Sequence, residues 1–137
     1  ENQKAIFKGL KDGTIDCIST NHHPHSIEDK EKDILHAPFG ILGLETAFGV
    51  VYGTMRKNGM SAFDIINLFT LKPTEIMSLD SMEIEEDKEA NITVLDLEQN
   101  WSVTKDNIYS KSKNTPFINT KLKGYVVATV IKNNICL

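Results

Sequence analysis

A long polar stretch, Thr20–Gly40, follows directly on a short apolar segment, Thr14–Ser19 (TIDCIS), and this succession constrains the fold most strongly. The segment Thr14–Ser19 is rich in β-branched residues and lies between turn signals, which predicts a strand of a parallel sheet covered on both faces. A loop as long as Thr20–Gly40 inside a compact domain is usually functional. In α/β folds, ligands bind at loops that follow the carboxyl ends of parallel strands, so the sequence predicts an α/β fold with its site on this loop.

Helical patterns flank the predicted strand and loop. Residues 1–11 form a short amphipathic pattern, and Leu44–Lys57 carries apolar residues at a clean helical spacing. Ser61 has the character of a helix N-cap, and the helix that it begins should end near Leu71, before Lys72 and Pro73. A further short helix is expected over Thr74–Leu79.

The pattern changes from helical to β after Asp80. We predict strand segments at Asn91–Asp96, Lys121–Val127 and Ala128–Ile135, with turn residues between them. The acidic segment Glu83–Glu89 (EIEEDKE) is interpreted as a solvated connection between the two parts.

Charge and composition exclude several classes of function for this chain. A formal net charge of −4 gives no basic surface for nucleic acid. No apolar run approaches the ~20 residues of a membrane span, and the charged start ENQK is no secretory signal. Cys17 and Cys136 lie far apart, and Cys17 is expected to be a small buried side chain. A reduced, cytoplasmic protein is therefore expected, with no nucleic-acid or membrane partner.

The long loop contains all the histidines of the chain, namely His22, His23, His25 and His36. Neutral imidazole is the commonest transition-metal ligand, and catalytic zinc usually takes three protein ligands and a water. Adjacent histidines on one loop rarely converge on one ion, however, so ordinary hydrogen-bonded loop residues are the alternative. The histidines alone do not decide between these two interpretations.

Several motifs taken together resemble one known family. They are DGTID at 12–16, TNHHPH at 20–25, APFGILGLETAF at 37–48, KNTPF at 113–117 and LKGYVV at 122–127. In this order they resemble the last barrel strand, the following loop and the closing β segment of dihydroorotases, which are cyclic amidohydrolases. The resemblance covers essentially the whole chain.

The resemblance implies a fold class for this chain: α/β, the C-terminal part of an amidohydrolase (β/α)₈ barrel followed by a small β segment of the flanking β-sandwich. Residues 1–82 would be the last βα units of the barrel, with the active-site loop at 20–43, and residues 83–137 would be the C-terminal β segment. Enzymes of this family hold one or two zinc ions. They interconvert N-carbamoyl-L-aspartate and L-dihydroorotate in pyrimidine biosynthesis.

The family motif Thr-Asp-His-Ala-Pro-His differs from this chain at two positions. Asn21 stands where the family has an aspartate that contacts zinc and moves the proton of the attacking water, and His23 stands where it has alanine. The resemblance makes His25, Pro38, Phe39 and Gly40 substrate-binding residues. A neutral amide cannot accept a proton near pH 7, so we expect catalysis to be badly impaired. The family's other metal ligands would precede Glu1, so we expect the isolated chain to be inactive.

Two alternative functions and several structural interpretations stay open. Some dihydroorotase-like proteins have lost their metal ligands and assemble with aspartate transcarbamoylase, and the change to Asn21 suits such a silent subunit. Allantoinase and dihydropyrimidinase share the architecture. A separate piece of a barrel would expose unpaired strand edges, so we expect either self-association or dependence on the rest of the barrel. Glu45 is interpreted as a carboxylate at the positive end of a helix, Trp101 as a partly buried anchor, and His36 as a hydrogen-bonded loop residue.

Overall fold

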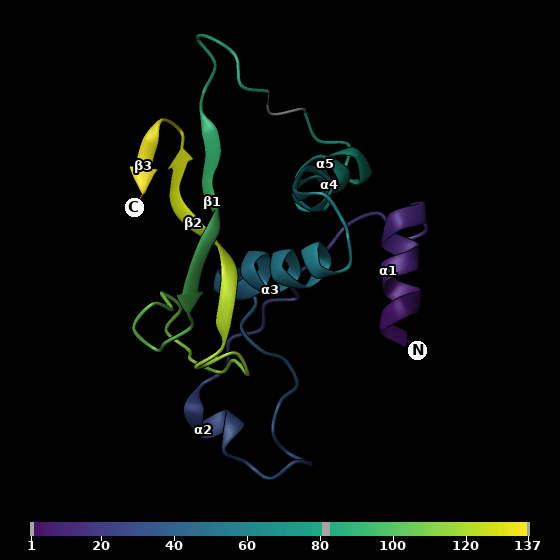
Figure 1. Cartoon of the computed structure of the whole chain (residues 1–137). Helices are drawn as coiled ribbons and strands as arrows, with labels where there is room; N and C mark the ends of the chain where they lie inside the picture. The colour runs from purple at the N-terminus through teal and green to yellow at the C-terminus, as the bar shows by residue number, and fades with distance from the viewer. Residues whose placement is uncertain (1, 81–82, 137) are drawn as a thin grey trace.

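The computed structural model describes residues 2–80 and 83–136, and it consists of short helices beside a small antiparallel sheet (Figure 1). The helices are α1 (Asn2–Asp12), α2 (Ile27–Lys30), α3 (Leu44–Lys57), α4 (Ala62–Asn67) and α5 (Leu71–Ile76). The strands are β1 (Asn91–Ser102), β2 (Lys121–Ile131) and β3 (Asn134–Cys136). Helix α3 packs against β2 and has the bounds that its apolar spacing predicts.

The strand predicted at Thr14–Ser19 is wrong for the described part of the chain. The segment forms no ladder there, and a single parallel bridge, His22 with Ile41, lies just after it. A parallel strand is held by hydrogen bonds to neighbours on both sides, but the backbone of this segment bonds to helical parts instead, as in Ile18 N to Leu68 O at 3.1 Å. Cys17 is half-buried rather than buried for the same reason, because no sheet covers it.

The sheet has the order β1-β2-β3, and all its pairs are antiparallel. Lys121–Val127 and Ala128–Ile135 were predicted as separate segments, but β2 runs unbroken from Lys121 to Ile131. The turn lies instead at Lys132 and Asn133, whose φ angles are 49° and 63°. Among the described residues, β1 has a neighbour on one side only, and the expectation of self-association stays a prediction.

The helices after α3 depart from their predicted bounds by a few residues. Ser61 caps α4 as expected, because its hydroxyl accepts a hydrogen bond from Asp64 N at 3.1 Å. Helix α4 ends at Asn67, however, and α5 already begins at Leu71 and includes Pro73. Pro73 is tolerated because it lies in the first turn, where a backbone N–H has no partner within the helix.

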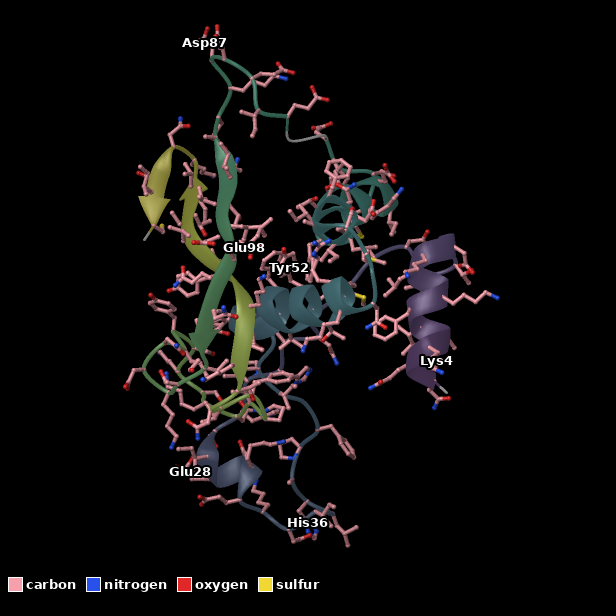
Figure 2. All side chains as sticks on the ribbon, viewed as in Figure 1. Lys4, Glu28, His36, Tyr52, Asp87 and Glu98 are labelled. Atoms are coloured by element: carbon pink, nitrogen blue, oxygen red, sulfur yellow. The ribbon has the colours of Figure 1, made fainter. Side chains whose placement is uncertain are left out.

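Two apolar clusters lie on either side of α3. The first contains Leu10, Tyr52, Met55, Met60, Ile65 and Leu68, and joins α1, α3 and α4. The second contains Leu42, Val103, Ile108 and Leu122, and joins the end of the long loop to the β part. Figure 2 shows Tyr52 near the middle of the molecule and Asp87 at the far tip of the connection into β1.

The acidic connection is exposed over 83–89, as its composition predicts. The boundary expected at residue 82 lies outside the described residues. None of the helices in the described ranges is long and apolar enough to span a membrane.

Candidate active site

Asn21 lies where the segment after α1 enters the long loop. Its backbone has a φ of 43°, which is left-handed, and Asn tolerates this conformation better than most residues. The side chain is exposed, and no described residue hydrogen-bonds to it. The side chain of Asn21 is therefore accessible from outside the loop, as a reacting group would need to be.

His22 caps helix α3, a role that sequence reasoning missed. Its Nδ1 accepts hydrogen bonds from Gly43 N at 3.2 Å and from Leu44 N at 3.3 Å. These are backbone donors at the helix N-terminus, which have no partner within the helix. An accepting Nδ1 carries no proton, so this nitrogen is occupied by the cap and is not free to bind a metal.

His23 and His25 lie side by side on the same arm of the loop. His23 Nδ1 lies 3.4 Å from His25 Nε2, and His25 Nε2 lies 2.9 Å from the carbonyl oxygen of Phe39. Gly40 packs directly on His23. A Cβ at residue 40 would lie 2.4 Å from the Cβ of His23, which is a clash, and the φ of 111° is a conformation that favours glycine. Glycine is thus required at residue 40 by both backbone conformation and space.

The predicted substrate-binding residues Pro38, Phe39 and Gly40 form the other arm of the loop. Lys30 holds this arm by donating hydrogen bonds to Pro38 O at 2.9 Å and Gly40 O at 3.2 Å. The Phe39 side chain is 94% exposed while its carbonyl faces His25. The structure therefore brings His25 and Pro38–Gly40 together. The role of Lys30 in holding this arm was not predicted, because nothing distinguishes it in the sequence from the other polar residues of the loop.

The β part supplies a second set of contacts to the loop, which sequence reasoning also missed. Asn114 Nδ2 donates to His23 O and Gly40 O, each at 3.3 Å, and Ser112 Oγ donates to His25 O at 2.5 Å. Leu42 N donates to Asn114 O at 3.0 Å. The motif KNTPF at 113–117 marked this segment, but nothing in the sequence placed it beside the histidines.

His36 is a hydrogen-bonded loop residue, as expected. Its Nδ1 lies 2.7 Å from a carboxylate oxygen of Asp33, and both side chains are exposed. The hydrogen bond from His36 lowers the pKa of Asp33. Asp29, nearer to His25, has its pKa lowered by hydrogen bonds from Lys32 and Ser26. The two carboxylates are thus occupied by their own neighbours.

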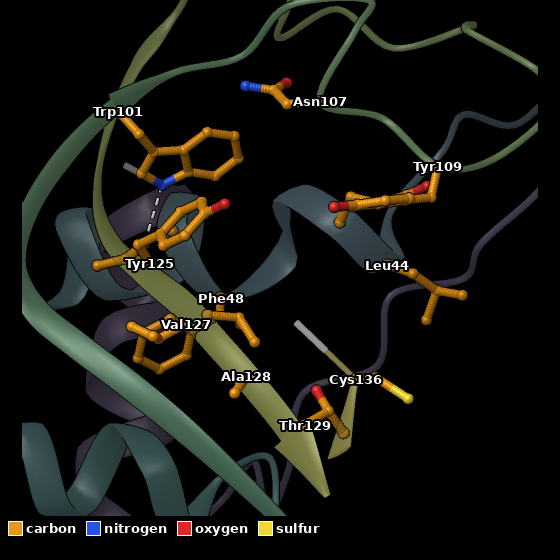
Figure 3. Close-up of a pocket in the computed structure, with 14 residues that line it drawn as sticks. Leu44, Phe48, Trp101, Asn107, Tyr109, Tyr125, Val127, Ala128, Thr129 and Cys136 are labelled. Atoms are coloured by element: carbon orange, nitrogen blue, oxygen red, sulfur yellow. Dashed lines mark hydrogen bonds between the residues drawn. The ribbon is translucent and has the colours of Figure 1, made fainter. Parts of the chain in front are cut away.

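Glu45 and Trp101 have the structural roles that the sequence predicts. Glu45 lies in the first turn of α3, and its Oε1 accepts a hydrogen bond from Ser110 N at 2.8 Å. Trp101 is half-buried, and its indole N–H donates to Gly124 O at 3.0 Å (Figure 3). Glu45 thus ties the segment after β1 to α3, whereas Trp101 ties β1 to β2.

A pocket of about 440 Å³ lies between α3 and β2, away from the long loop (Figure 3). Aromatic side chains line it, among them Phe48, Trp101, Tyr109 and Tyr125. It contains none of the predicted site residues, so its shape does not locate the chemistry.

The described residues do not fit a complete zinc site. Within 2–80 and 83–136, no group of three or more His, Cys, Asp or Glu side chains comes together to hold a metal ion. His22 is occupied by the cap of α3, and His25 bonds to Phe39. Asn21 offers only a neutral amide oxygen, a weak ligand for zinc.

The geometry is that of a helical and β unit whose polar loop carries a candidate hydrolytic site, and sequence comparison places it in a family. The model of the amidohydrolase family matches residues 1–136, so the chain belongs to this family. It is 42% identical over 136 residues to a dihydroorotase of Bacillus cytotoxicus, and 39% identical to one of Staphylococcus epidermidis. Each match covers 98% of this chain and 32% of the relative, as its C-terminal part. The resemblance to dihydroorotases is confirmed.

Solved structures of related enzymes show the same fold. An L-hydantoinase of Arthrobacter aurescens matches with a TM-score of 0.81 and 26% identity, covering 95% of this chain and 30% of the enzyme. A dihydropyrimidinase of Brevibacillus agri matches with a TM-score of 0.86 and 16% identity, over 98% of this chain and 31% of the enzyme. The family implies a barrel-type α/β fold, of which this chain spans about a third of the relatives' length. The described residues contain the three-stranded sheet and helices, and no barrel.

The inactive dihydroorotase-like domain of a CAD-like multifunctional protein from Chaetomium thermophilum also matches. Its TM-score is 0.67 and its identity 19%, over 97% of this chain and 35% of that one. At this identity the match shows the fold alone.

Proposed function

We propose that this chain forms the C-terminal part of a dihydroorotase, which interconverts N-carbamoyl-L-aspartate and L-dihydroorotate in cytoplasmic pyrimidine biosynthesis. One observation carries the proposal: His25 and the backbone of Pro38–Gly40 meet on one loop, through the contact of His25 Nε2 with Phe39 O at 2.9 Å, just after Asn21. The identity of about 40% to dihydroorotases supports it. In the proposal, residues 1–82 are the last barrel units and residues 83–137 the terminal β segment.

The residues of this chain would bind and orient the substrate. The Nε2–H of His25, which here donates to the carbonyl of Phe39, would donate to a substrate carboxylate instead, and the arm at Pro38–Gly40 would contact the ring through its backbone. Asn21 can donate or accept a hydrogen bond beside the scissile amide, but it cannot take a proton from water. Family members are generally metal-dependent, and zinc belongs to the proposal as a cofactor whose main ligands these residues do not supply.

The second candidate is a silent dihydroorotase-like subunit that assembles with aspartate transcarbamoylase. The amide of Asn21 favours it, because the position has lost its base. The resemblance in fold to an inactive dihydroorotase-like domain is consistent with it. Two measurements distinguish the candidates. A silent subunit forms a stable complex with aspartate transcarbamoylase in gel filtration, and it has no affinity for dihydroorotate.

Replacing His25 by alanine should weaken the binding of L-dihydroorotate about 10- to 100-fold in the complete polypeptide that carries this chain. The expected loss is that of a hydrogen bond to a charged group, about 1.5–3 kcal/mol. Isothermal titration calorimetry measures the dissociation constant directly and requires no turnover.

His36→Ala is the matched control, because His36 is exposed and bonds only to Asp33 among the described residues. It should change the dissociation constant less than twofold. Equal weakening by both substitutions would contradict the role of His25. A parent protein that does not bind dihydroorotate would contradict the proposed function itself.

A further inference from the structure

Asn114 lies where the two arms of the candidate site meet the β part. Its side-chain oxygen accepts a hydrogen bond from His25 N at 3.4 Å, and its side-chain nitrogen donates to His23 O and Gly40 O, each at 3.3 Å. His23 and His25 belong to one arm of the loop and Gly40 to the other. A single side chain therefore bridges both arms.

An amide is the group that fits this place. The contacts require one acceptor and two donors on neighbouring atoms, and a carboxamide provides both where a carboxylate or hydroxyl does not. Ser112 completes the arrangement, because its hydroxyl donates to His25 O and lies against Asn114 Oδ1. These partners are nearly ninety residues away in the chain, so local backbone structure does not explain the contacts.

The backbone of Asn114 is itself anchored in the apolar core. Its carbonyl accepts the hydrogen bond of Leu42 N at 3.0 Å, and Leu42 is 2% exposed within the second cluster. The bridge is therefore fixed to a packed part of the molecule, whereas His25 and Gly40, which it holds, are only half-buried.

We propose that Asn114 is a positioning residue for the substrate site. It holds the backbone of His25 and Gly40 at a fixed distance from each other, so that the imidazole of His25 stays beside Phe39 and Gly40, where it can reach the substrate carboxylate. This inference rests on the proposed function. Asn114 does not touch the reacting atoms, and its effect passes through His25.

Asn114→Asp in the complete polypeptide tests the proposal. The substitution keeps the acceptor for His25 N and replaces both donors with a carboxylate oxygen that faces the carbonyls of His23 and Gly40. Calorimetry should show about tenfold weaker binding of L-dihydroorotate, the effect of one or two lost hydrogen bonds. Hydrogen exchange measured by mass spectrometry should become faster in peptides covering 20–43.

Asn107→Asp is the matched control in the same β part. Asn107 also ties a turn through its amide, accepting from Thr104 N at 2.8 Å and donating to Ser102 O at 2.7 Å, but it does not contact the loop. It should alter neither dihydroorotate binding nor exchange at 20–43. Ser112→Ala is a milder second variant, for use if Asn114→Asp does not fold. It removes the hydroxyl that contacts His25 O and Asn114 Oδ1, and it should weaken binding about threefold.

Each outcome decides the proposal. Weaker binding together with faster exchange, in Asn114→Asp or Ser112→Ala but not in Asn107→Asp, supports it. Faster exchange with unchanged binding means a purely structural tie and overturns the proposal, as does no change in either measurement. Weaker binding with unchanged exchange also overturns it, because the effect would then not pass through the position of the loop. If the parent protein does not bind dihydroorotate, the proposed function itself fails, and the role of Asn114 at a substrate site fails with it; if the parent binds and only the variants show no effect, the inference alone fails.

Discussion

Replacing Asn21 by aspartate in the complete polypeptide should raise kcat for dihydroorotate hydrolysis about 10²- to 10⁴-fold. General acid–base catalysis contributes this factor, which corresponds to about 3–5 kcal/mol of barrier. Asn and Asp have nearly the same shape, but the carboxylate can accept a proton from the attacking water and the amide cannot. Steady-state hydrolysis of L-dihydroorotate measures the effect.

The structure around residue 21 indicates that Asn21→Asp should leave the fold intact. The φ of 43° is a conformation that Asp tolerates almost as well as Asn, and the side chain is exposed. Asn100→Asp is the control, because it changes the net charge equally at an exposed site on β1 and should leave kcat unchanged. If Asn21→Asp gives no gain, other losses limit turnover, and the silent subunit becomes the favoured function.

Leu42→Ala should lower the free energy of unfolding by about 2–5 kcal/mol, the cost of removing a fully buried leucine side chain and leaving a cavity. Leu42 is 2% exposed and packs in the cluster with Val103, Ile108 and Leu122. The backbone N–H of Leu42 also bonds to Asn114 O. Loosening the core around residue 42 should therefore loosen the attached loop as well. Denaturant titration followed by tryptophan fluorescence measures the stability, because Trp101 packs against this cluster.

Leu35→Ala is the matched control on the same loop. Leu35 is 87% exposed, so the same deletion should change the stability by less than about 0.5 kcal/mol. Comparable losses from the two substitutions would show that the cluster around Leu42 is not a core in solution.

The helices were the most predictable part of the fold, for a physical reason. The pattern over Leu44–Lys57 gave the bounds of α3 because its apolar stripe and its end at Asn58-Gly59 are both local signals. The apolar stripe predicted burial less accurately than it predicted the bounds. Tyr52 and Met55 are buried, but Leu44 is 64% exposed. Burial at a helix end depends on what lies opposite, and local periodicity does not contain that information.

The strand at Thr14–Ser19 shows where local reasoning fails. Its composition fits a parallel strand, but such a strand forms only beside neighbouring strands, and none pairs with it among the described residues. The sequence was divided between Val127 and Ala128, yet pairing with β1 carries β2 through this point. Pairing partners distant in sequence decided both cases.

The candidate site was predictable only in part. The motif resemblance brought out His25 and Pro38–Gly40, and the structure places them together. The cap formed by His22, the tie from Lys30 and the bridge from Asn114 were missed, because each depends on a backbone group whose position only the folded chain sets. The sequence around a polar loop residue does not indicate which backbone carbonyl its side chain will bond to in the folded protein.

The bridge from Asn114 also has a consequence for the order in which the protein matures on the ribosome. His25 is translated nearly ninety residues before Asn114, whose side chain bonds to its backbone. The loop therefore leaves the exit tunnel before these hydrogen bonds can form. Closing a separation of that length carries an entropic cost that grows with the logarithm of the distance. The two arms of the loop therefore lack these hydrogen bonds until residues 112–114 have been translated, and a chain terminated before residue 112 would never form them.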